Sequence, residues 1–270
     1  MTTIDLPAGE GTRAGRARDL IGSEWTKLWS VRSTYWVLLC AAVTAIGIGA
    51  VVADADVGDW PRMSPAQRAA FDPLSDPYIG FMIAQLIFGT LGVLSITGEY
   101  SSGLIRTTFA AVPARRAVLA AKAAVVTAVT VPVGAAIAAA TFATGQAVLS
   151  RRHVGLSIGD PGALRSIGAA TFYLLAVALV GLGLGVLLRH AAAAIGALVT
   201  LLFLAPQLIH GTARWVVDIA DALPGDAIRR LVSLHAQHGA LSVPQEFVVI
   251  SVYPVVLIGA AMLVIHRRDA

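Results

Sequence analysis

The sequence predicts an all-α protein that spans a membrane six times, and three observations lead to this fold class. The chain of 270 residues is 57% hydrophobic and only 13% charged, against about 25% charged residues in an ordinary soluble domain. Its mean hydropathy is +0.76. Its charges are also clustered, so that long charge-free segments separate them. These segments lie at 33–53, 77–98, 123–150, 166–188, 190–213 and 247–266.

Each charge-free segment is long enough to cross a bilayer as a helix. About 20 apolar residues, at about 1.5 Å rise each, cross a hydrocarbon core of about 30 Å. A charge at the centre of a span would cost about 2.5–3.5 kcal/mol, so these gaps are not accidental. We expect one membrane domain over residues 20–270, preceded by a flexible basic tail at 1–19. Its spans are expected at about 34–53, 78–97, 118–149, 166–188, 191–210 and 247–266.

The first span is expected to be retained, because residues 1–19 do not resemble a secretory signal. This stretch has no apolar core and contains Arg13, Arg16 and Arg18. Cys40 is the only cysteine of the chain and lies inside the first expected span. A single cysteine excludes an intramolecular disulfide and a cysteine-based zinc site.

The distribution of Lys and Arg predicts that both termini are cytoplasmic. Six spans place the two termini on one side, and that side carries more Lys and Arg, with a concentration before the first span. Arg151 and Arg152 lie on the opposite side and oppose this bias. The pI of about 9.6 is then explained by positive charge at the inner membrane surface rather than by nucleic-acid binding.

An amphipathic helix is expected directly before the first span, at residues 20–32. Its apolar residues recur at i, i+4, i+7 and i+8, and two tryptophans place it at headgroup level. Glu24 and Lys27 are expected on its other face. The apolar residues are Ile21, Trp25, Leu28 and Trp29.

A second amphipathic segment lies between the second and third spans, at residues 98–122. Its apolar residues line one side of a helix, which a simple connecting loop would not need. Pro113 ends this helix because its ring has no N–H for the hydrogen-bond ladder. The residues on that side are Leu104, Ile105, Thr108, Phe109 and Val112.

The remaining connections are expected on the outer side. Residues 54–76 form an acidic loop with room for one short helix, and 212–223 and 225–238 predict two short helices at or in the outer leaflet. Within the expected spans no carboxylate occurs, which argues against a proton-coupled carrier. Two prolines are expected to kink spans, and three glycines predict close helix packing. These are Pro132, Pro206, Gly181, Gly183 and Gly185.

No group of residues points to catalysis or to a bound metal. Ser157 lies in a G-x-S-x-G sequence, but its charged and Pro-Gly flanks do not form the strand and helix that a nucleophile elbow needs. His235 and His238 share a helical spacing without a third ligand, so they are interpreted as surface histidines. The P-loop pattern for ATP is absent from the sequence. We expect no catalytic residue, metal or cofactor in this chain.

Two stretches resemble one known family. Residues 23–36, Ser-Glu-Trp-Thr-Lys-Leu-Trp-Ser-Val-Arg-Ser-Thr-Tyr-Trp, resemble the start of permease subunits of type-2 ATP-binding-cassette (ABC) exporters. Residues 98–108, with Pro113, Arg115 and Lys122 after them, resemble the loop between the second and third spans of those permeases. The resemblance extends over the six-span layout.

The resemblance implies a function and a set of partners. It implies a cytoplasmic coupling helix that docks on a separate ATPase, which holds ATP and Mg, and an assembly of two permeases with two ATPases. It further implies export across the bacterial cell membrane of a drug, antibiotic, lipid or other amphipathic compound. The implied coupling residues are Glu99, Tyr100, Leu104, Ile105, Arg106, Phe109 and Val112. The implied elbow-helix residues are Glu24, Trp25, Lys27, Leu28, Trp29 and Arg32.

The residue pattern itself leaves alternatives open. An apolar helical face fits the groove of a partner protein, and it equally fits a helix that lies on lipid. Arg115, Arg116 and Lys122 are expected to anchor the third span at the anionic leaflet. The alternative function is a non-transporting membrane partner of an ATPase, such as a sensor or an immunity module.

Overall fold

The protein is all-α over the residues that the structure describes. A computed structural model describes residues 13–104, 114–209, 217, 219–220, 222–234 and 241–268, with side chains from residue 18 to 265. Six helical segments in these ranges are long and apolar enough to cross a membrane, which confirms the expected fold class. They are Arg32–Arg62, Asp76–Ser102, Arg115–Arg152, Ala163–Leu188, Ala191–Leu208 and Val243–Ile265.

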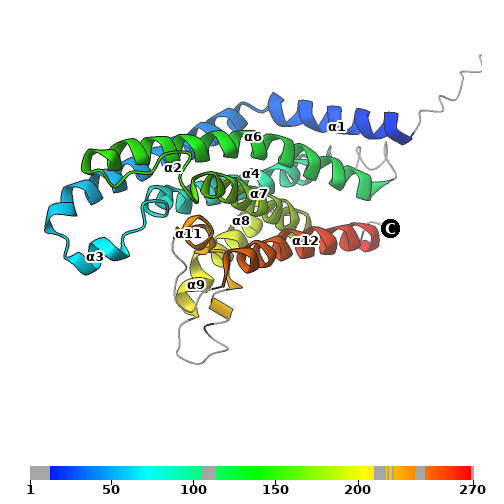
Figure 1. The fold of residues 1–270 in the computed structure, drawn as a ribbon. Coiled ribbons are helices and arrows are strands. Elements are labelled where there is room, and N and C mark those ends of the chain that lie inside the picture. The colour runs from blue at the N-terminus through cyan, green and yellow to red at the C-terminus, as the bar shows by residue number, and fades with distance from the viewer. Residues whose placement is uncertain are drawn as a thin grey trace, which may run out of the picture.

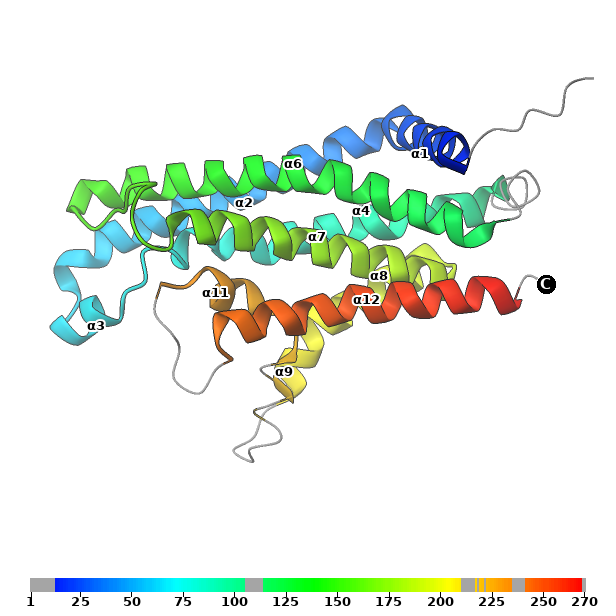
Figure 2. The same cartoon turned by 45° about the vertical axis from the view of Figure 1, so that its right-hand side comes forward.

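The long helices lie side by side in a bundle (Figures 1 and 2). Helix α1, the C-terminal end of α4, the start of α6 and the C-terminal end of α12 lie at one end, here named the α1 end. Helices α3 and α11 lie toward the other, here named the α11 end. The helices are α1 (Arg13–Ser30), α2 (Arg32–Asp59), α3 (Pro65–Ala70), α4 (Phe81–Ser102), α6 (Arg115–Leu149), α7 (Ala163–Leu188), α8 (Ala191–Val199), α9 (Ala205–Leu208), α11 (Ala227–Val232) and α12 (Val243–Arg268). Short turns of helix join some of them: η1 (Trp60–Arg62), η2 (Asp76–Gly80), η3 (Ser150–Arg152) and η4 (Thr200–Leu204).

Several helices extend beyond the boundaries expected from charge. Helix α1 begins at Arg13, inside the segment expected to be a flexible tail, and α2 continues through Asp54 and Asp56 to Asp59. Glu99 lies in the last turns of α4, and Glu246 in the first turn of α12. The prediction of the helix bounds is therefore too short, while the expected spans themselves hold no carboxylate. That prediction ended the spans at the first charged residue, whereas a helix can continue through charged residues whose side chains form ion pairs or are exposed to water.

Helix α7 is the centre of the bundle, and it approaches α4 with backbone against backbone. A Cβ atom added to Gly181 would lie 2.0 Å from the carbonyl oxygen of Gly89, and one added to Gly92 would lie 1.9 Å from that of Ala178. Only glycine permits such an approach at these positions. On another side of α7, a Cβ at Gly183 would meet Leu257 of α12 at 2.8 Å. The close packing expected at Gly181 and Gly183 is confirmed.

The peripheral spans expose apolar side chains, as lipid-facing helices do. In α2, Val43 is 62% and Val51 70% exposed, and in α12, Val255 is 69% exposed. Leu208, at the end of α9, is 73% exposed. The preceding segment η4 is a π-helical turn, and Pro206 follows it in the first turn of α9. The expected disturbance of the fifth span thus falls at Thr200–Leu204, just before the proline.

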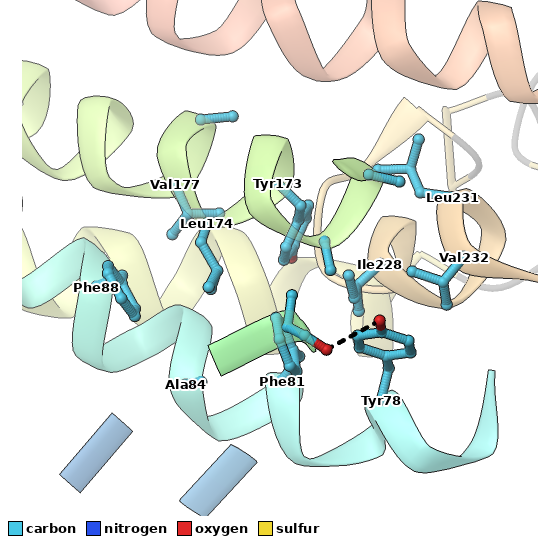
Figure 3. Close-up of a cluster of buried hydrophobic side chains, with 14 of the residues drawn as sticks. Tyr78, Phe81, Ala84, Phe88, Tyr173, Leu174, Val177, Ile228, Leu231 and Val232 are labelled. Carbon is cyan, nitrogen blue, oxygen red and sulfur yellow. Dashed lines mark hydrogen bonds between the residues drawn. The ribbon is translucent and has the colours of Figure 1, made fainter. Parts of the chain in front are cut away.

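Helix α11 packs inside the protein and differs from the expected leaflet helix. Ile228, Leu231 and Val232 are fully buried, and they lie close to Tyr78 and Tyr173 (Figure 3). The apolar face that indicated lipid therefore contacts the spans instead. The other helix expected in this connection, at 212–223, lies largely outside the described residues.

Candidate functional site

The first helix turns into the first span at a single extended residue. Val31 adopts φ −90° and ψ 111° between α1 and α2. Thr34 supports this bend, because its side-chain hydroxyl donates to the Leu28 carbonyl oxygen at 2.9 Å and its amide donates to Val31 at 3.0 Å. Thr34 is buried, so the geometry of the elbow is fixed from within the protein.

Glu24 faces inward from α1, which corrects the face expected for it. The sequence placed Glu24 opposite an apolar face directed to the membrane or protein. In the structure Glu24 is 4% exposed, while Ile21 and Trp25 are each 42% exposed. The inward position is explained by Lys122 of α6, a buried ammonium group that requires an opposite charge.

Four charged side chains form the ion cluster: Glu24, Lys27, Glu99 and Lys122. Lys122 Nζ lies 2.5 Å from Glu24 Oε2 and 2.7 Å from Glu99 Oε1. Lys27 Nζ lies 2.7 Å from Glu24 Oε1 and 3.0 Å from Glu99 Oε1. Two positive and two negative charges give the ion cluster no formal net charge. It joins α1 to the last turns of α4 and to the first turns of α6.

The ion cluster is largely sealed from solvent. Glu24, Glu99 and Lys122 are 4%, 7% and 3% exposed. Burial by itself lowers the pKa of Lys27. Hydrogen bonds and charge attraction from Glu24 and Glu99 raise it by more than this, so the pKa of Lys27 lies above its ordinary value. Lys122 was expected to anchor a span at the leaflet, whereas its ammonium lies inside the protein between two carboxylates.

Such a cluster fixes the arrangement of helices more than it increases stability. The cost of removing charges from water offsets most of their attraction, while the loss of one partner leaves a buried charge unpaired. A displacement of α1 or of the α4 end therefore has to move the other partners along with it. The ion cluster thus links the elbow helix to the two helix ends that border residues 105–113.

Further contacts at the α1 end connect the remaining spans. The guanidinium of Arg189, at the end of α7, lies 5.5 Å from the centre of the Tyr100 ring of α4. Arg115, at the start of α6, donates to the Ile265 carbonyl oxygen of α12 at 3.4 Å. These contacts join the end of α7 to the end of α4, and the start of α6 to the end of α12.

The other predicted site residues have varied surroundings. Leu104 is 54% exposed at the end of the described part of the second span. Trp25 and Trp29 pack with ring centres 5.8 Å apart, and Trp29 lies 5.1 Å from Tyr35. Arg32 and Arg116 are exposed. Ile105, Arg106, Phe109 and Val112 lie outside the described residues, as do His235 and His238.

A second polar network, at the α11 end, was not foreseen from the sequence. Arg165 of α7 donates to the carbonyl oxygens of Leu231 at 2.7 Å and Ser233 at 2.5 Å. Asp72 accepts from the Ser233 hydroxyl at 2.6 Å and the Leu234 amide at 2.7 Å.

Two more contacts hold the chain on either side of α11. Arg230 pairs with the fully buried Glu246 of α12 at 2.9 Å. The Tyr173 hydroxyl donates to the Pro224 carbonyl oxygen at 2.8 Å. Most acceptors at the α11 end are backbone carbonyls. Every residue has a backbone carbonyl, so these contacts could not be predicted from the residue types in the sequence.

The structure describes the surroundings of Ser157 and the distribution of possible metal ligands over part of the chain. Ser157 lies in an exposed turn, and its amide donates to the Asp160 carboxylate at 2.6 Å. Within the described ranges no group of three His, Cys, Asp or Glu residues is placed to hold a metal ion.

Comparison with known proteins adds no relative: no protein-family model and no curated protein matches the chain.

Proposed function

We propose that the chain is the permease subunit of a type-2 ABC exporter in a bacterial cell membrane, with both termini cytoplasmic. It works as a pair of permeases with two copies of a separate ATPase, which supplies ATP hydrolysis. The substrate class is an amphipathic compound, such as a drug, antibiotic or lipid. The proposal rests first on the resemblance of residues 23–36 and 98–122 to that family.

The observation that carries the proposal is the ion cluster between α1, α4 and α6. A partner that docks on residues 104–113 pushes on the end of α4 and the start of α6. Glu99 and Lys122 lie at these two ends and pair with each other. Lys122 also pairs with Glu24 of the elbow helix, and Glu99 pairs with Lys27 of the same helix. The exposed Leu104 offers an apolar contact to that partner.

The distribution of charge supports the orientation. The helix ends at the α1 end carry Lys27, Arg32, Arg115, Arg116 and Arg189. The segments at the opposite end also contain arginines, but in the sequence as a whole Lys and Arg are fewer on that side. The described arginines there are Arg62, Arg68, Arg151, Arg152, Arg165, Arg229 and Arg230. An excess of Lys and Arg marks the cytoplasmic side of short loops.

The test is co-purification with a co-expressed ABC ATPase, followed by transport in vesicles. We expect Leu104→Asp and Phe109→Asp to lose the ATPase while membrane insertion remains normal, since a charge replaces an apolar anchor. Val43→Asp is unsuitable as a control, because a charge at this exposed position within the first span would oppose membrane insertion. Arg116→Asp, exposed at the start of α6, serves instead as a charge change outside the apolar face.

The outcomes separate the two functions. ATP-driven movement of a compound, lost in both variants, supports the exporter. Stable binding of the ATPase without movement of any tested compound would indicate a non-transporting partner. Undiminished binding in Leu104→Asp and Phe109→Asp would contradict the docking role of this segment.

A further inference from the structure

A cleft runs between α2 and α4 directly below the ion cluster. One hollow of about 350 Å³ is lined by the four charged side chains and by apolar residues of α2, α4 and α6. A second, of about 420 Å³, continues between α2 and α4 and is almost wholly apolar. The two hollows adjoin, because Ser33 and Val37 line both.

The cleft is charged at one end and apolar along its length. Beyond the ion cluster, the walls are formed by Val37 and Cys40 of α2 and by Ile87 and Leu91 of α4. From Ser33 to Cys40 the wall extends about 10 Å along the helix axis. The neighbouring surface of α2 is apolar and open: Trp36 is 67% and Leu39 52% exposed. A membrane lipid next to α2 can therefore enter the cleft from the side.

Hydrogen-bond counting shows what the ion cluster lacks. An ammonium carries three N–H groups. Those of Lys122 are occupied by Glu24, Glu99 and the Ser95 carbonyl oxygen. Lys27 donates to Glu24 and Glu99, so one N–H remains.

The acceptors are also unevenly used. Both oxygens of Glu24 are bound. Glu99 Oε1 accepts from Lys27 and Lys122, whereas the buried Oε2 has no hydrogen-bond partner among the described residues. A buried carboxylate oxygen without a donor is costly. The ion cluster therefore has one spare donor, on the partly exposed Lys27, and one spare acceptor, the buried Glu99 Oε2, at the charged end of an apolar cleft.

We propose that this cleft binds one membrane aminophospholipid of the phosphatidylethanolamine type. Its primary ammonium donates to Glu99 Oε2, its phosphate accepts from Lys27, and an acyl chain lies between α2 and α4. The headgroup carries one charge of each sign a short link apart, and it therefore leaves the ion cluster neutral. This inference goes beyond the proposed function, and it holds whether or not an ATPase binds.

The headgroup test compares two lipids that differ at the nitrogen. Phosphatidylcholine has three methyl groups there and no N–H, so it cannot donate to Glu99. The full chain, purified in detergent, is mixed with equal amounts of dioleoyl-phosphatidylethanolamine and dioleoyl-phosphatidylcholine. Native mass spectrometry then measures the lipid that stays bound. We expect a preference for phosphatidylethanolamine on the order of tenfold, the value of one charge-assisted hydrogen bond.

The cleft test uses a pair of matched variants on one helix. Val37→Trp fills the cleft, whereas Val43→Trp adds the same ring to a residue that is 62% exposed and lines neither hollow. We expect bound phosphatidylethanolamine to fall on the order of tenfold in Val37→Trp and to stay unchanged in Val43→Trp.

Three results would overturn the inference. The first is equal binding of the two lipids to the unaltered chain, a measurement that needs no variant to fold. The second is an unchanged amount of bound phosphatidylethanolamine in Val37→Trp. The third is an unaltered chain that binds neither lipid and forms a dimer, together with a Val37→Trp variant that no longer forms one. That result would assign the cleft to a second copy of the chain.

Discussion

The two ends of the helix bundle are both held by polar contacts, but the contacts differ in kind. At the α1 end, side chains pair with side chains, and the ion cluster contains two ammonium groups and two carboxylates. At the α11 end, Arg165 and Tyr173 bind backbone carbonyls of the connection before α12. The α11 end also contains the buried ion pair of Arg230 with Glu246, but most of its acceptors are backbone carbonyls. The first arrangement therefore depends on charge balance, and the second depends more on the path of the backbone. The difference predicts distinct responses to substitution and to pH.

The largest effect is expected from Lys122→Met at the α1 end. Loss of this ammonium leaves two buried carboxylates with Lys27 alone, and breaking a buried pair costs about 3–5 kcal/mol. Thermal unfolding in detergent measures the loss. Arg116→Met, an exposed charge on the same helix, is the control and should change little.

A double variant separates charge from packing in that experiment. Glu24→Gln with Lys122→Met restores formal neutrality, so it should recover part of the stability lost in Lys122→Met. Equal destabilisation in the single and double variants would show that the ion cluster contributes through packing rather than through charge.

A smaller effect is expected from Arg165→Met at the α11 end. The change leaves the carbonyl oxygens of Leu231 and Ser233 without their guanidinium donor, at a cost of about 2 kcal/mol. Faster hydrogen exchange in Ala227–Val232 reports the loosening of α11. Arg151→Met, which removes an exposed pair with Asp54, is the matched control. Equal exchange of α11 in both variants would contradict a tethering role for Arg165.

The smallest effect, a response to pH, should have opposite signs at the two ends. Burial by itself raises the pKa of Asp72. The hydrogen bonds that its carboxylate accepts lower the pKa by more than this, so it lies below the ordinary 3.8. The donors are Ser233, Leu74, Ser75 and Leu234. The contribution of Asp72 to stability is present above pH 3.8 and is lost as the pH falls through its lowered pKa. The raised pKa of Lys27 has the opposite consequence. Its contribution is complete below 10.5 and is lost as the pH rises through the raised value.

Hydrogen exchange as a function of pH, corrected for intrinsic rates, checks this contrast. Amides of α11 should open at acid pH, and those of α1 at alkaline pH. Asp72→Asn should abolish the acid response, and Lys27→Met the alkaline one. Opening of α11 at alkaline pH alone would contradict the assignment.

The spans could be predicted from the sequence because the cost of a buried charge is large and leaves long gaps in the charge pattern. The ends of the helices could not, since Asp54, Glu99 and Glu246 are accommodated within helices by exposure or by partners. Glu24 was assigned to the wrong face for a related reason. Amphipathic periodicity treats every charge as solvated, and only the position of Lys122, far along the chain, makes an inward carboxylate favourable.

The α11 end shows a different limit of sequence reasoning. Ile228, Leu231 and Val232 indicated a helix with one apolar face, and α11 has one. Whether that face meets lipid or protein depends on tertiary contacts, here with Tyr78 and Tyr173 (Figure 3). The carbonyl acceptors that hold the segment are common to all residues and leave no trace in the sequence.

The backbone contact between α4 and α7 bears on how the molecule can move. At Gly181 and Gly92 there is no side chain to change rotamer, so neither helix can slide along the other without a clash of main-chain atoms. We therefore expect α4 and α7 to move as one rigid body. Helix α2 meets η2, at the start of the second span, in the same way, because a Cβ at Gly49 would lie 2.1 Å from the Pro77 carbonyl oxygen. Any alternation between conformations then falls to the α8–α9 segment and to α12.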